Sequence, residues 1–234
     1  MFKTAVHVSI DIETGNLSPD QVEFETQFLK HHPSTKDPDK QAAQVEKKAS
    51  FLLDRGALTN SAPILSVALN WGGTPAVLHN FPYDGKLSEY GLLAYKFNSE
   101  SDMLEGFREF MDNICSEETV IVVAGEHFDL PKLRLAMARN RIKIPESISP
   151  GSPNKIYDVL YVGGKYFLLG NKRHHDLGLD ELCLRLGVKT GGKVISGSEV
   201  PNMADAGQYE EILVYNGLDA IKNTECWKVM TGNY

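Results

Sequence analysis

Four acidic residues and a tyrosine, far apart along the chain, have types and local spacings that suit metal chemistry. They form three groups, which are Asp11 with Glu13, Asp129 alone, and Tyr215 with Asp219. Carboxylate oxygens are the ligands that hard cations such as magnesium prefer. Two such cations about 3.5–4 Å apart can activate a water and stabilise both the attacking and the leaving oxygen of an in-line displacement. The set therefore predicts a site for two divalent metals and a phosphodiester.

The spacing within each group places its side chains on a common face. In a strand, alternate side chains share a face, so Asp11 and Glu13 are expected to point the same way. In a helix, residues four apart share a face, so Tyr215 and Asp219 are expected to lie together. Asp129 follows an apolar run, where a strand would be succeeded by a helix. Carboxylates brought together in this way would repel one another, and divalent cations would relieve that repulsion.

The hydrophobic pattern predicts an α/β domain that would assemble these groups. The apolar run 120–124 suits a buried parallel strand, and Gly72 and Gly73 form the turn of an expected hairpin between 62–71 and 76–80. Together with 3–12, the hairpin would make the antiparallel part of a sheet. A short extended segment is expected at 22–29 and a loop at 145–154. Helices are expected over 39–55, 101–115, 130–141, 177–186 and 210–230.

Length and composition indicate one globular domain. A chain of 234 residues suits a single domain over 1–234, and 42% hydrophobic residues are ample for a core. The charged segment at about 36–56, which begins Lys36-Asp37-Pro38, is expected to form a helical insertion. Its function is left open between a lid over the substrate and a helix that docks a partner.

The sequence also bears on the compartment. Three widely spaced cysteines favour neither a disulfide framework nor a zinc site. No apolar run approaches the ~20 residues of a membrane span, and the first residues resemble a strand rather than a signal peptide. We therefore expect a soluble, cytoplasmic protein that does not bind membranes.

The order of the motifs resembles the DEDD superfamily of 3′–5′ exonucleases. The matches are Asp11-x-Glu13 to the first motif, Phe128-Asp129 to the second and Tyr215-x-x-x-Asp219 to the third. The resemblance covers most of the chain. It implies an RNase H-like fold, which is a mixed sheet flanked by helices.

One position separates the branches of this superfamily. The DEDDh branch has histidine five residues before the last aspartate, where this chain has Val214, and Tyr215 places it in the DEDDy branch. The chain is most similar to stand-alone phage or bacterial exonucleases that resemble the proofreading domain of family B DNA polymerases. The run Leu179-Asp-Glu-Leu-Cys-Leu-Arg-Leu-Gly187 resembles the helix before the third motif in that group, and a phage origin of the gene is left open.

The resemblance implies a role for each site residue. Asp11, Glu13 and Asp219 would hold two Mg²⁺ or Mn²⁺ ions, with Asp129 supporting the second ion, and Tyr215 would orient the attacking water. Hydrolysis of the terminal phosphodiester of single-stranded DNA would release nucleoside monophosphates, and a DNA polymerase or another replication protein is the expected partner. Further substrate contacts are expected from Thr14, Phe128, Lys132 and Arg173.

One position departs from the family pattern. The second motif usually has Asn four residues before its Phe, and this chain has Ala124 there. That Asn tends to bind substrate rather than metal, so the departure concerns substrate handling. Glu126 and His127 are the nearby polar residues that would be able to compensate.

The formal net charge of −7 is unusual for a protein that binds nucleic acid. Two basic clusters are candidates for phosphate contacts, although a solvated helix face is an equally good interpretation of each. The clusters are Lys132, Arg134, Arg139, Arg141 and Lys143, and the run Lys172-Arg-His-His175.

Three alternative functions stay open at the level of the sequence. An exoribonuclease would use the same site, because the motifs do not distinguish the sugars. A non-catalytic nucleic-acid-binding or polymerase-associated module is a second alternative, although no metal ligand is lost. An endonuclease or resolvase of the same fold is a third, and the tyrosine motif disfavours it.

Overall fold

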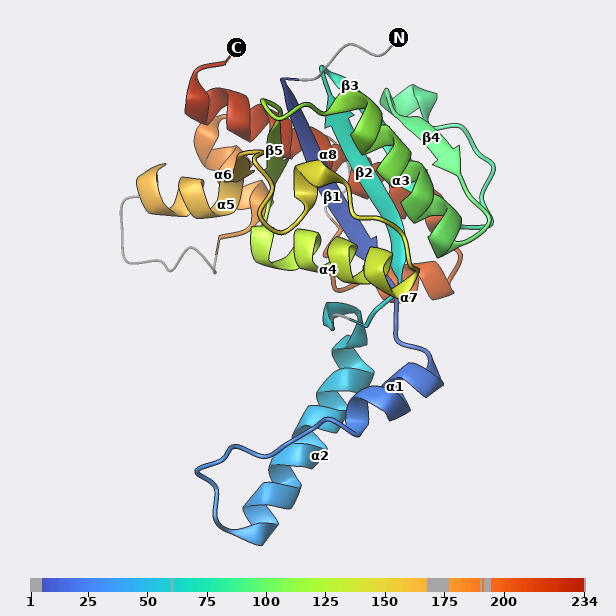
Figure 1. Ribbon diagram of the computed structural model, residues 1–234, viewed down its shortest axis with the longest axis vertical. Coiled ribbons are helices and arrows are strands. Elements are labelled where there is room, and N and C mark those ends of the chain that lie inside the picture. Colours follow the sequence, from blue (N-terminus) through green and yellow to red (C-terminus); the bar gives the residue numbers. More distant parts are fainter. Residues whose placement is uncertain (1–5, 60, 168–176, 190, 192–194, 234) are drawn as a thin grey trace.

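The structure is a computed structural model that describes residues 6–59, 61–167, 177–189, 191 and 195–233. Within these residues a mixed sheet of six strands lies between layers of helices (Figure 1). The strands are β1 (His7–Thr14), β2 (Ile64–Trp71), β3 (Thr74–His79), β4 (Leu93–Lys96), β5 (Val120–Val123) and β6 (Ile156–Asp158). Their order is β4-β3-β2-β1-β5-β6. Strands β1 to β3 are antiparallel, while β5 pairs in parallel with β1 and with β6, and β4 in parallel with β3.

The alternation along β1 assigns its two sides to different layers. Val8, Ile10 and Ile12 belong to the main hydrophobic core. The intervening residues face the other layer, where Ser9 and Asp11 form hydrogen bonds to side chains of α8 (Tyr209–Thr231). The period of two that predicted a shared face for Asp11 and Glu13 therefore holds, and that face is directed at α8.

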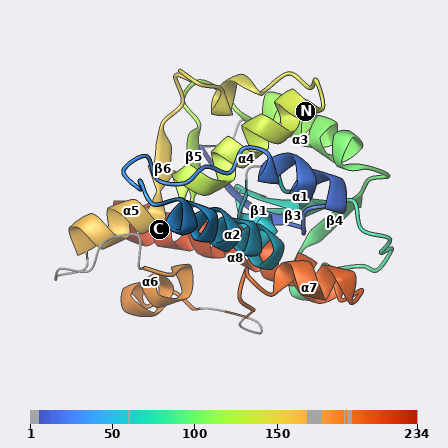
Figure 2. The same cartoon turned by 90° about the horizontal axis from the view of Figure 1, so that it is seen from below.

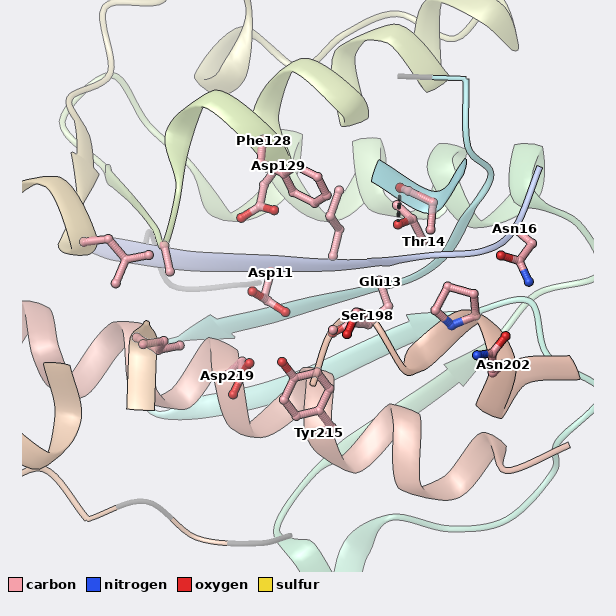
Figure 3. Close-up of a pocket in the computed structure, with 17 residues that line it drawn as sticks. Asp11, Glu13, Thr14, Asn16, Phe128, Asp129, Ser198, Asn202, Tyr215 and Asp219 are labelled. Carbon is pink, nitrogen blue, oxygen red and sulfur yellow. Dashed lines mark hydrogen bonds between the residues drawn. The ribbon is translucent and has the colours of Figure 1, made fainter. Parts of the chain in front are cut away.

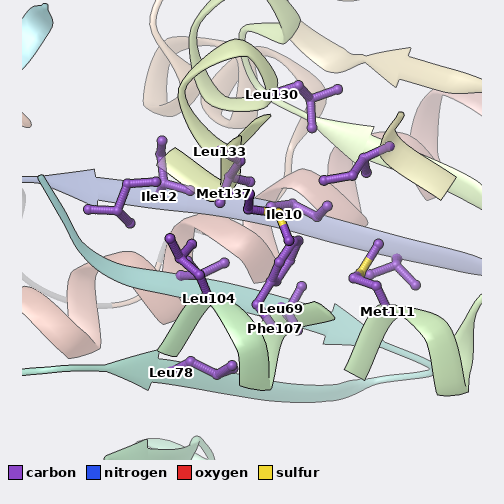
Figure 4. Close-up of a cluster of buried hydrophobic side chains, with 14 of the residues drawn as sticks. Ile10, Ile12, Leu69, Leu78, Leu104, Phe107, Met111, Leu130, Leu133 and Met137 are labelled. Carbon is purple, nitrogen blue, oxygen red and sulfur yellow. The ribbon is translucent and has the colours of Figure 1, made fainter. Parts of the chain in front are cut away.

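Helices cover both faces of the sheet. On one side, α3 (Glu100–Ile114) and α4 (Glu126–Arg139) pack on the main core, where Phe107 and Leu130 are fully buried (Figure 4). On the other side, α8 packs with α6 (Leu179–Leu186) and α7 (Val200–Asp205). Two smaller cores hold this second layer together. The predicted α/β class is confirmed, with helices on both sides of a mixed sheet.

A helical arm connects β1 to β2 and extends away from the body (Figure 1). It consists of α1 (Pro19–Thr26), α2 (Pro38–Arg55) and a 3₁₀ turn at Gly56–Leu58. Its own core is small and centres on the buried Leu17, Leu52 and Ala62. The predicted helix over 39–55 is confirmed. The helical segment is longer than the predicted insertion, because it begins directly after β1.

The extended segment predicted at 22–29 is wrong. Residues Pro19–Thr26 form a helix that a capping box stabilises: the Ser18 hydroxyl accepts the Gln21 N–H at 3.3 Å, and the Gln21 side chain accepts the Ser18 N–H at 2.8 Å. Pro19, at the first helical position, has the backbone angle that a helix start needs. These local signals outweigh the polar, weakly periodic sequence that follows.

The other predicted elements agree with the structure to within a few residues, and residues 3–5 of the strand predicted over 3–12 lie outside the described residues. One shift matters for the site. The helix predicted over 130–141 begins at Glu126, so Asp129 lies inside the first turns of α4 rather than before it. The sequence did not predict β4, β6, α7 or the one-turn α5 (Val159–Val162), which are all short. Short 3₁₀ turns occur at Ser88–Tyr90 and Glu146–Ile148, and a π-helical turn at Gly163–Phe167. No helix in the described part of the chain has the length and apolar character needed to cross a membrane.

Candidate active site

A cavity of about 370 Å³ lies where the end of β1 faces the start of α4 and the middle of α8 (Figure 3). All five residues of the predicted metal site line it, although they come from three separate elements. These residues are Asp11, Glu13, Asp129, Tyr215 and Asp219. Figure 3 shows the carboxylates of Asp11, Asp129 and Asp219 directed into the same space, with the Tyr215 hydroxyl beside them. The predicted convergence of the three groups is therefore present in the fold.

Strand β1 contributes Asp11 and Glu13, and a hydrogen-bond relay orients the first of them. Asn216 of α8 donates from Nδ2 to Oδ2 of Asp11 at 2.7 Å. The Oδ1 of Asn216 accepts the hydroxyl of Ser66, on β2, at 2.9 Å. Asn216 is fully buried. Because both ends of its amide are engaged, Asn216 can present only its donor side to Asp11.

Helix α8 contributes Tyr215 and Asp219, one turn apart on the side that faces β1. A buried cation lies behind Asp219: the Lys222 amine donates to its Oδ1 at 2.7 Å and is 2.8 Å from Oδ1 of Asp180 on α6. Since Lys222 bridges two carboxylates, it holds α6 against α8 and reduces the negative charge at this edge of the cavity.

Helix α4 contributes Asp129, whose side chain is buried, with its residue only 3% exposed. Its Oδ2 has no hydrogen-bond partner among the described residues. Leaving a buried carboxylate oxygen unpaired is costly, so the group needs a cation or a proton. Among the described residues of the site, Oδ2 of Asp129 is the buried side-chain oxygen that lacks a hydrogen-bond partner.

A different aspartate shapes the turn before α4. The Asp158 carboxylate accepts the backbone N–H groups of Gly125 and Glu126 at 3.3 and 2.8 Å, and those of Leu160 and Tyr161 at 2.9 and 3.0 Å. Gly125 has a φ of +105°, which a side chain would strain. Asp158 therefore caps two helix starts and has its oxygens occupied, which assigns it a structural role.

Burial and mutual repulsion set the electrostatics of the cavity. Burial, followed by repulsion from neighbouring carboxylates, raises the pKa of Asp11, Glu13 and Asp129 well above their ordinary values. Burial also raises the pKa of Asp219, and the Lys222 ammonium opposes that shift. Burial and the nearby carboxylates raise the pKa of Tyr215 as well, so its phenol stays protonated. Without a counter-ion, the four acids therefore tend to hold protons.

The residues present fit a hard divalent cation by their chemistry. The donors are carboxylate oxygens, which magnesium and manganese favour, and one of them is the orphaned Oδ2 of Asp129. In the described part of the chain, no three His, Cys, Asp or Glu side chains already surround one point closely enough to hold an ion.

The predicted substrate contacts divide into those that line the cavity and those that do not. Thr14 and Phe128 line it, and the Thr14 hydroxyl donates to the Ala57 carbonyl at 2.8 Å. Lys132 does not line the cavity. The prediction that it contacts phosphate is corrected by its hydrogen bonds within the fold. Its amine is buried and donates to the Ala57 and Thr59 carbonyls at 2.6 and 2.7 Å. Arg173 and the cluster 172–175 lie outside the described residues.

The basic cluster 132–143 is also largely engaged within the fold. Arg134 donates to the Ile148 carbonyl, and Arg139 pairs with Glu100 at 2.9 Å. Arg141 and Lys143 are exposed. Most of this cluster holds α4 in place, which favours the structural interpretation over a phosphate-binding face.

Several residues of the site were not expected from the sequence. Asn216 and Lys222 flank the third motif, and only the helical spacing of three between Asp219 and Lys222 signalled a pair. Ser198 and Asn202 line the cavity from α7 and the loop before it. Such a short helix has too few turns to show periodicity, so nothing in the sequence marked it.

Ala124 lines the cavity at the end of β5, where the family pattern would place Asn. Glu126 and His127 are not among the cavity-lining residues. At position 124 a small, apolar side chain forms the cavity wall.

Neither a family model nor a curated protein matches the chain. The function is therefore inferred from the residues and the geometry of the site.

Proposed function

We propose that the protein is a metal-dependent 3′–5′ exonuclease of the DEDDy type that acts on single-stranded DNA. The observation that carries the proposal is the convergence of three sequence motifs, more than 200 residues apart from first to last, in one cavity. A chance set of acids would be placed by solvation on the surface rather than buried together. Their shared burial without enough counter-charge is characteristic of a functional site.

The side-chain roles follow from the placement of each residue. Asp11, Glu13 and Asp219 would hold the metals, with the orphaned Oδ2 of Asp129 supporting the second. Divalent ions bound there would supply an activated water and neutralise charge that develops on the phosphate. Because its phenol stays protonated, Tyr215 would orient the attacking water by hydrogen bonding and would not act as a base. Asn216 would keep Asp11 in position.

The architecture supports an RNase H-like fold. Three antiparallel strands, β3-β2-β1, continue into the parallel strands β5 and β6, and helices cover both faces. The first motif lies on the central strand β1, the second at the start of the helix after β5, and the third on the last helix. The parallel edge strand β4 is an addition beside β3.

The net negative charge of the chain supports weak binding of its substrate. Because binding to phosphates releases counter-ions, this binding should also weaken as the salt concentration rises. Such an enzyme would benefit from a DNA polymerase or another replication protein that delivers the strand. Roles in proofreading, replication or repair follow from this proposal.

The direct test uses a 5′-labelled single strand. With Mg²⁺ or Mn²⁺, it should shorten stepwise from its 3′ end and release nucleoside monophosphates, and EDTA should stop the reaction. Asp11→Ala should abolish cleavage while circular dichroism shows a folded protein. Glu118→Ala, at an exposed acid just before β5 that does not line the cavity, is the matched control and should keep full activity.

The same experiment separates the alternatives. Matched DNA and RNA strands digested in parallel identify the preferred sugar. Wild-type protein that binds the strand with metal present but never shortens it would show a binding module instead. Internal cuts in a circular strand would show an endonuclease.

A further inference from the structure

The helical arm between β1 and β2 is attached directly at the mouth of the candidate active site (Figure 1). Asn16, at its first end, and Ala57, at its second, both line the cavity. The Ala57 carbonyl accepts hydrogen bonds from Thr14 of β1 and Lys132 of α4, which fixes the base of the arm to the body. Figure 1 shows the arm extending away from this end of the body, and in Figure 2, seen from below, α1 and α2 lie in front of the sheet. A strand leaving the cavity would therefore meet the arm.

Three phenylalanines on the arm are exposed to solvent. Phe24, Phe28 and Phe51 are 55%, 60% and 48% exposed. The rings of Phe24 and Phe28 lie with centroids 5.0 Å apart in an edge-to-face arrangement, one helical turn apart in sequence. The small core of the arm does not use these rings, although burial would favour them there. Exposed rings that gather on one element are typical of a surface that binds a partner.

A hollow of about 510 Å³ lies on the same arm, and apolar atoms form almost all of its lining. Leu29, Phe51 and Leu52 line it together with Lys47 and Lys48. Lys47 precedes Phe51 by four residues on α2, so the two share a face of the helix.

The outer part of the arm has a different charge from the rest of the protein. Residues 27–52 contain five lysines and three acids, whereas the whole chain has a net charge of −7. All five of these lysines are exposed. Residues 27–52 thus provide a locally basic surface that includes Phe28 and Phe51, whereas Phe24 lies on α1 between Glu23 and Glu25.

We propose that this arm binds the single strand upstream of the 3′ end that occupies the cavity, with its phenylalanines stacking on bases and its lysines contacting phosphates. This inference rests on the proposed exonuclease function. Exposed aromatics interleaved with lysines are the two elements that unspecific single-strand binding requires. A protein partner would contact the rings of the arm, but it would have no reason to extend into the cavity. A nucleic acid strand would contact both the rings and the cavity.

The dependence of binding affinity on strand length tests the proposed role of the arm. Helix α2 has 18 residues and so spans about 27 Å, so a trinucleotide held in the cavity cannot follow the arm over its whole length. Fluorescence anisotropy in EDTA would measure binding of a labelled trinucleotide and of a single strand of about 20 nucleotides, without cleavage. The wild type should bind the long strand much more tightly than the short one.

Two arm variants should remove that difference. The triple variant Phe24→Ala, Phe28→Ala, Phe51→Ala should weaken long-strand binding by about five- to tenfold per stacked base lost. Lys47→Ala with Lys48→Ala should reduce the slope of log K against log salt by about 1.4. Both should cleave the trinucleotide at the wild-type rate with metal present. The matched controls are Leu93→Ala and Lys86→Ala, exposed residues on or near the edge strand β4, and both should bind like the wild type.

The outcomes separate this inference from the exonuclease proposal. Arm variants that bind the long strand as tightly as the wild type would overturn the role of the arm, whatever the cleavage result. The inference would likewise be wrong if the phenylalanine variant changed only the oligomeric state in gel filtration, which would indicate a second copy as the occupant. Loss of length-dependent binding in a protein that cleaves nothing would support the arm and overturn the exonuclease.

Discussion

Asn216 of α8 donates a hydrogen bond of 2.7 Å to the carboxylate of Asp11 on β1, and so joins the third motif to the first. The Ser66 hydroxyl fixes the opposite end of the amide from β2. Three elements therefore meet through one buried side chain. This relay holds Asp11 in one orientation in a cavity where repulsion between carboxylates would otherwise turn it away.

Asn216→Ala should therefore impair both stability and activity. The change leaves the buried Ser66 hydroxyl and one oxygen of Asp11 without their partner, which costs about 1–3 kcal/mol of unfolding free energy. We expect kcat to fall about tenfold or more, with a higher metal concentration needed for half-maximal rate. Urea denaturation and metal titration of the rate would measure these effects, and Asn113→Ala on the surface of α3 is the control. An unchanged metal requirement would mean that Asn216 only supports the fold.

The shifted acids predict how stability depends on pH without metal. The unfolded carboxyls ionise near their ordinary values of 3.8 and 4.5, while the folded protein retains its protons to higher pH. The folded state thus binds more protons above about pH 4, so these acids make the unfolding free energy fall as pH rises. Burial of His7 and His79 lowers the pKa of each and gives the opposite slope at lower pH. The informative quantity is therefore the difference in unfolding free energy between the wild type and Asp129→Asn at each pH.

In EDTA, Asp129→Asn should be more stable than the wild type, and its advantage should grow from pH 5 to pH 8. Mg²⁺ or Mn²⁺ should raise the Tm of the wild type, more so at the higher pH because it binds ionised carboxylates. The variant should gain little from metal. Thermal melts at both pH values, with and without metal, would check this. If neither ion raised the Tm of the wild type, the result would argue against the metal site.

Tyr215→Phe isolates the proposed role of the phenol. The hydroxyl should act as a hydrogen-bond donor, because its raised pKa keeps it neutral. Removing it should lower kcat by roughly tenfold, the worth of about one hydrogen bond, and leave the metal-induced rise in Tm intact. Single-turnover cleavage at saturating metal would measure the effect. An unchanged rate would exclude an essential role for the hydroxyl.

Strand and helix periods fix which neighbours share a face, whereas the expectation that the three groups meet in one site came from their order, spacing and resemblance to the exonuclease motifs. Asp11 with Glu13, and Tyr215 with Asp219, needed only the rule of shared faces. The position of Lys132 did not follow from any such rule. Its partners are backbone carbonyls of the turn after α2, more than 70 residues away, and backbone groups carry no sequence signature. The position of Lys132 beside the second motif therefore suggested phosphate binding. In the fold, its amine instead forms hydrogen bonds to backbone carbonyls.

Helix α1 was missed for another reason. Its start signal, Ser18 with Gln21, was present in the sequence. The residues after that signal lack an apolar stripe, since the helix buries none of them. Sequence periodicity detects helices that pack on a core, and this one is held mainly by its cap and by contact with α2.

Lys132→Met tests the structural role assigned to that side chain. The change leaves the Ala57 and Thr59 carbonyls without their donor, so the unfolding free energy should fall by about 1–3 kcal/mol. The salt dependence of strand binding should not change, because the amine does not face phosphate. Lys143→Ala, at an exposed site of the same cluster, should leave stability within about 0.5 kcal/mol of the wild type. A shallower salt slope in Lys132→Met would restore the phosphate role.

Ala124→Asn tests whether the lack of an amide at this position limits the proposed exonuclease activity. Ala124 borders the cavity at the end of β5, so an amide placed there would reach the space that the substrate is proposed to occupy. It would offer donors and an acceptor to the strand without adding a charge to the carboxylate cluster. We expect KM for single-stranded DNA to fall several-fold while the metal dependence of the rate stays the same. Steady-state kinetics over a range of strand concentrations would measure this, and Ala124→Ser, which adds polarity with less reach, is the control. A higher KM in Ala124→Asn would mean that the small residue makes room for the substrate, and that this cavity holds its strand without the contact that the family pattern provides.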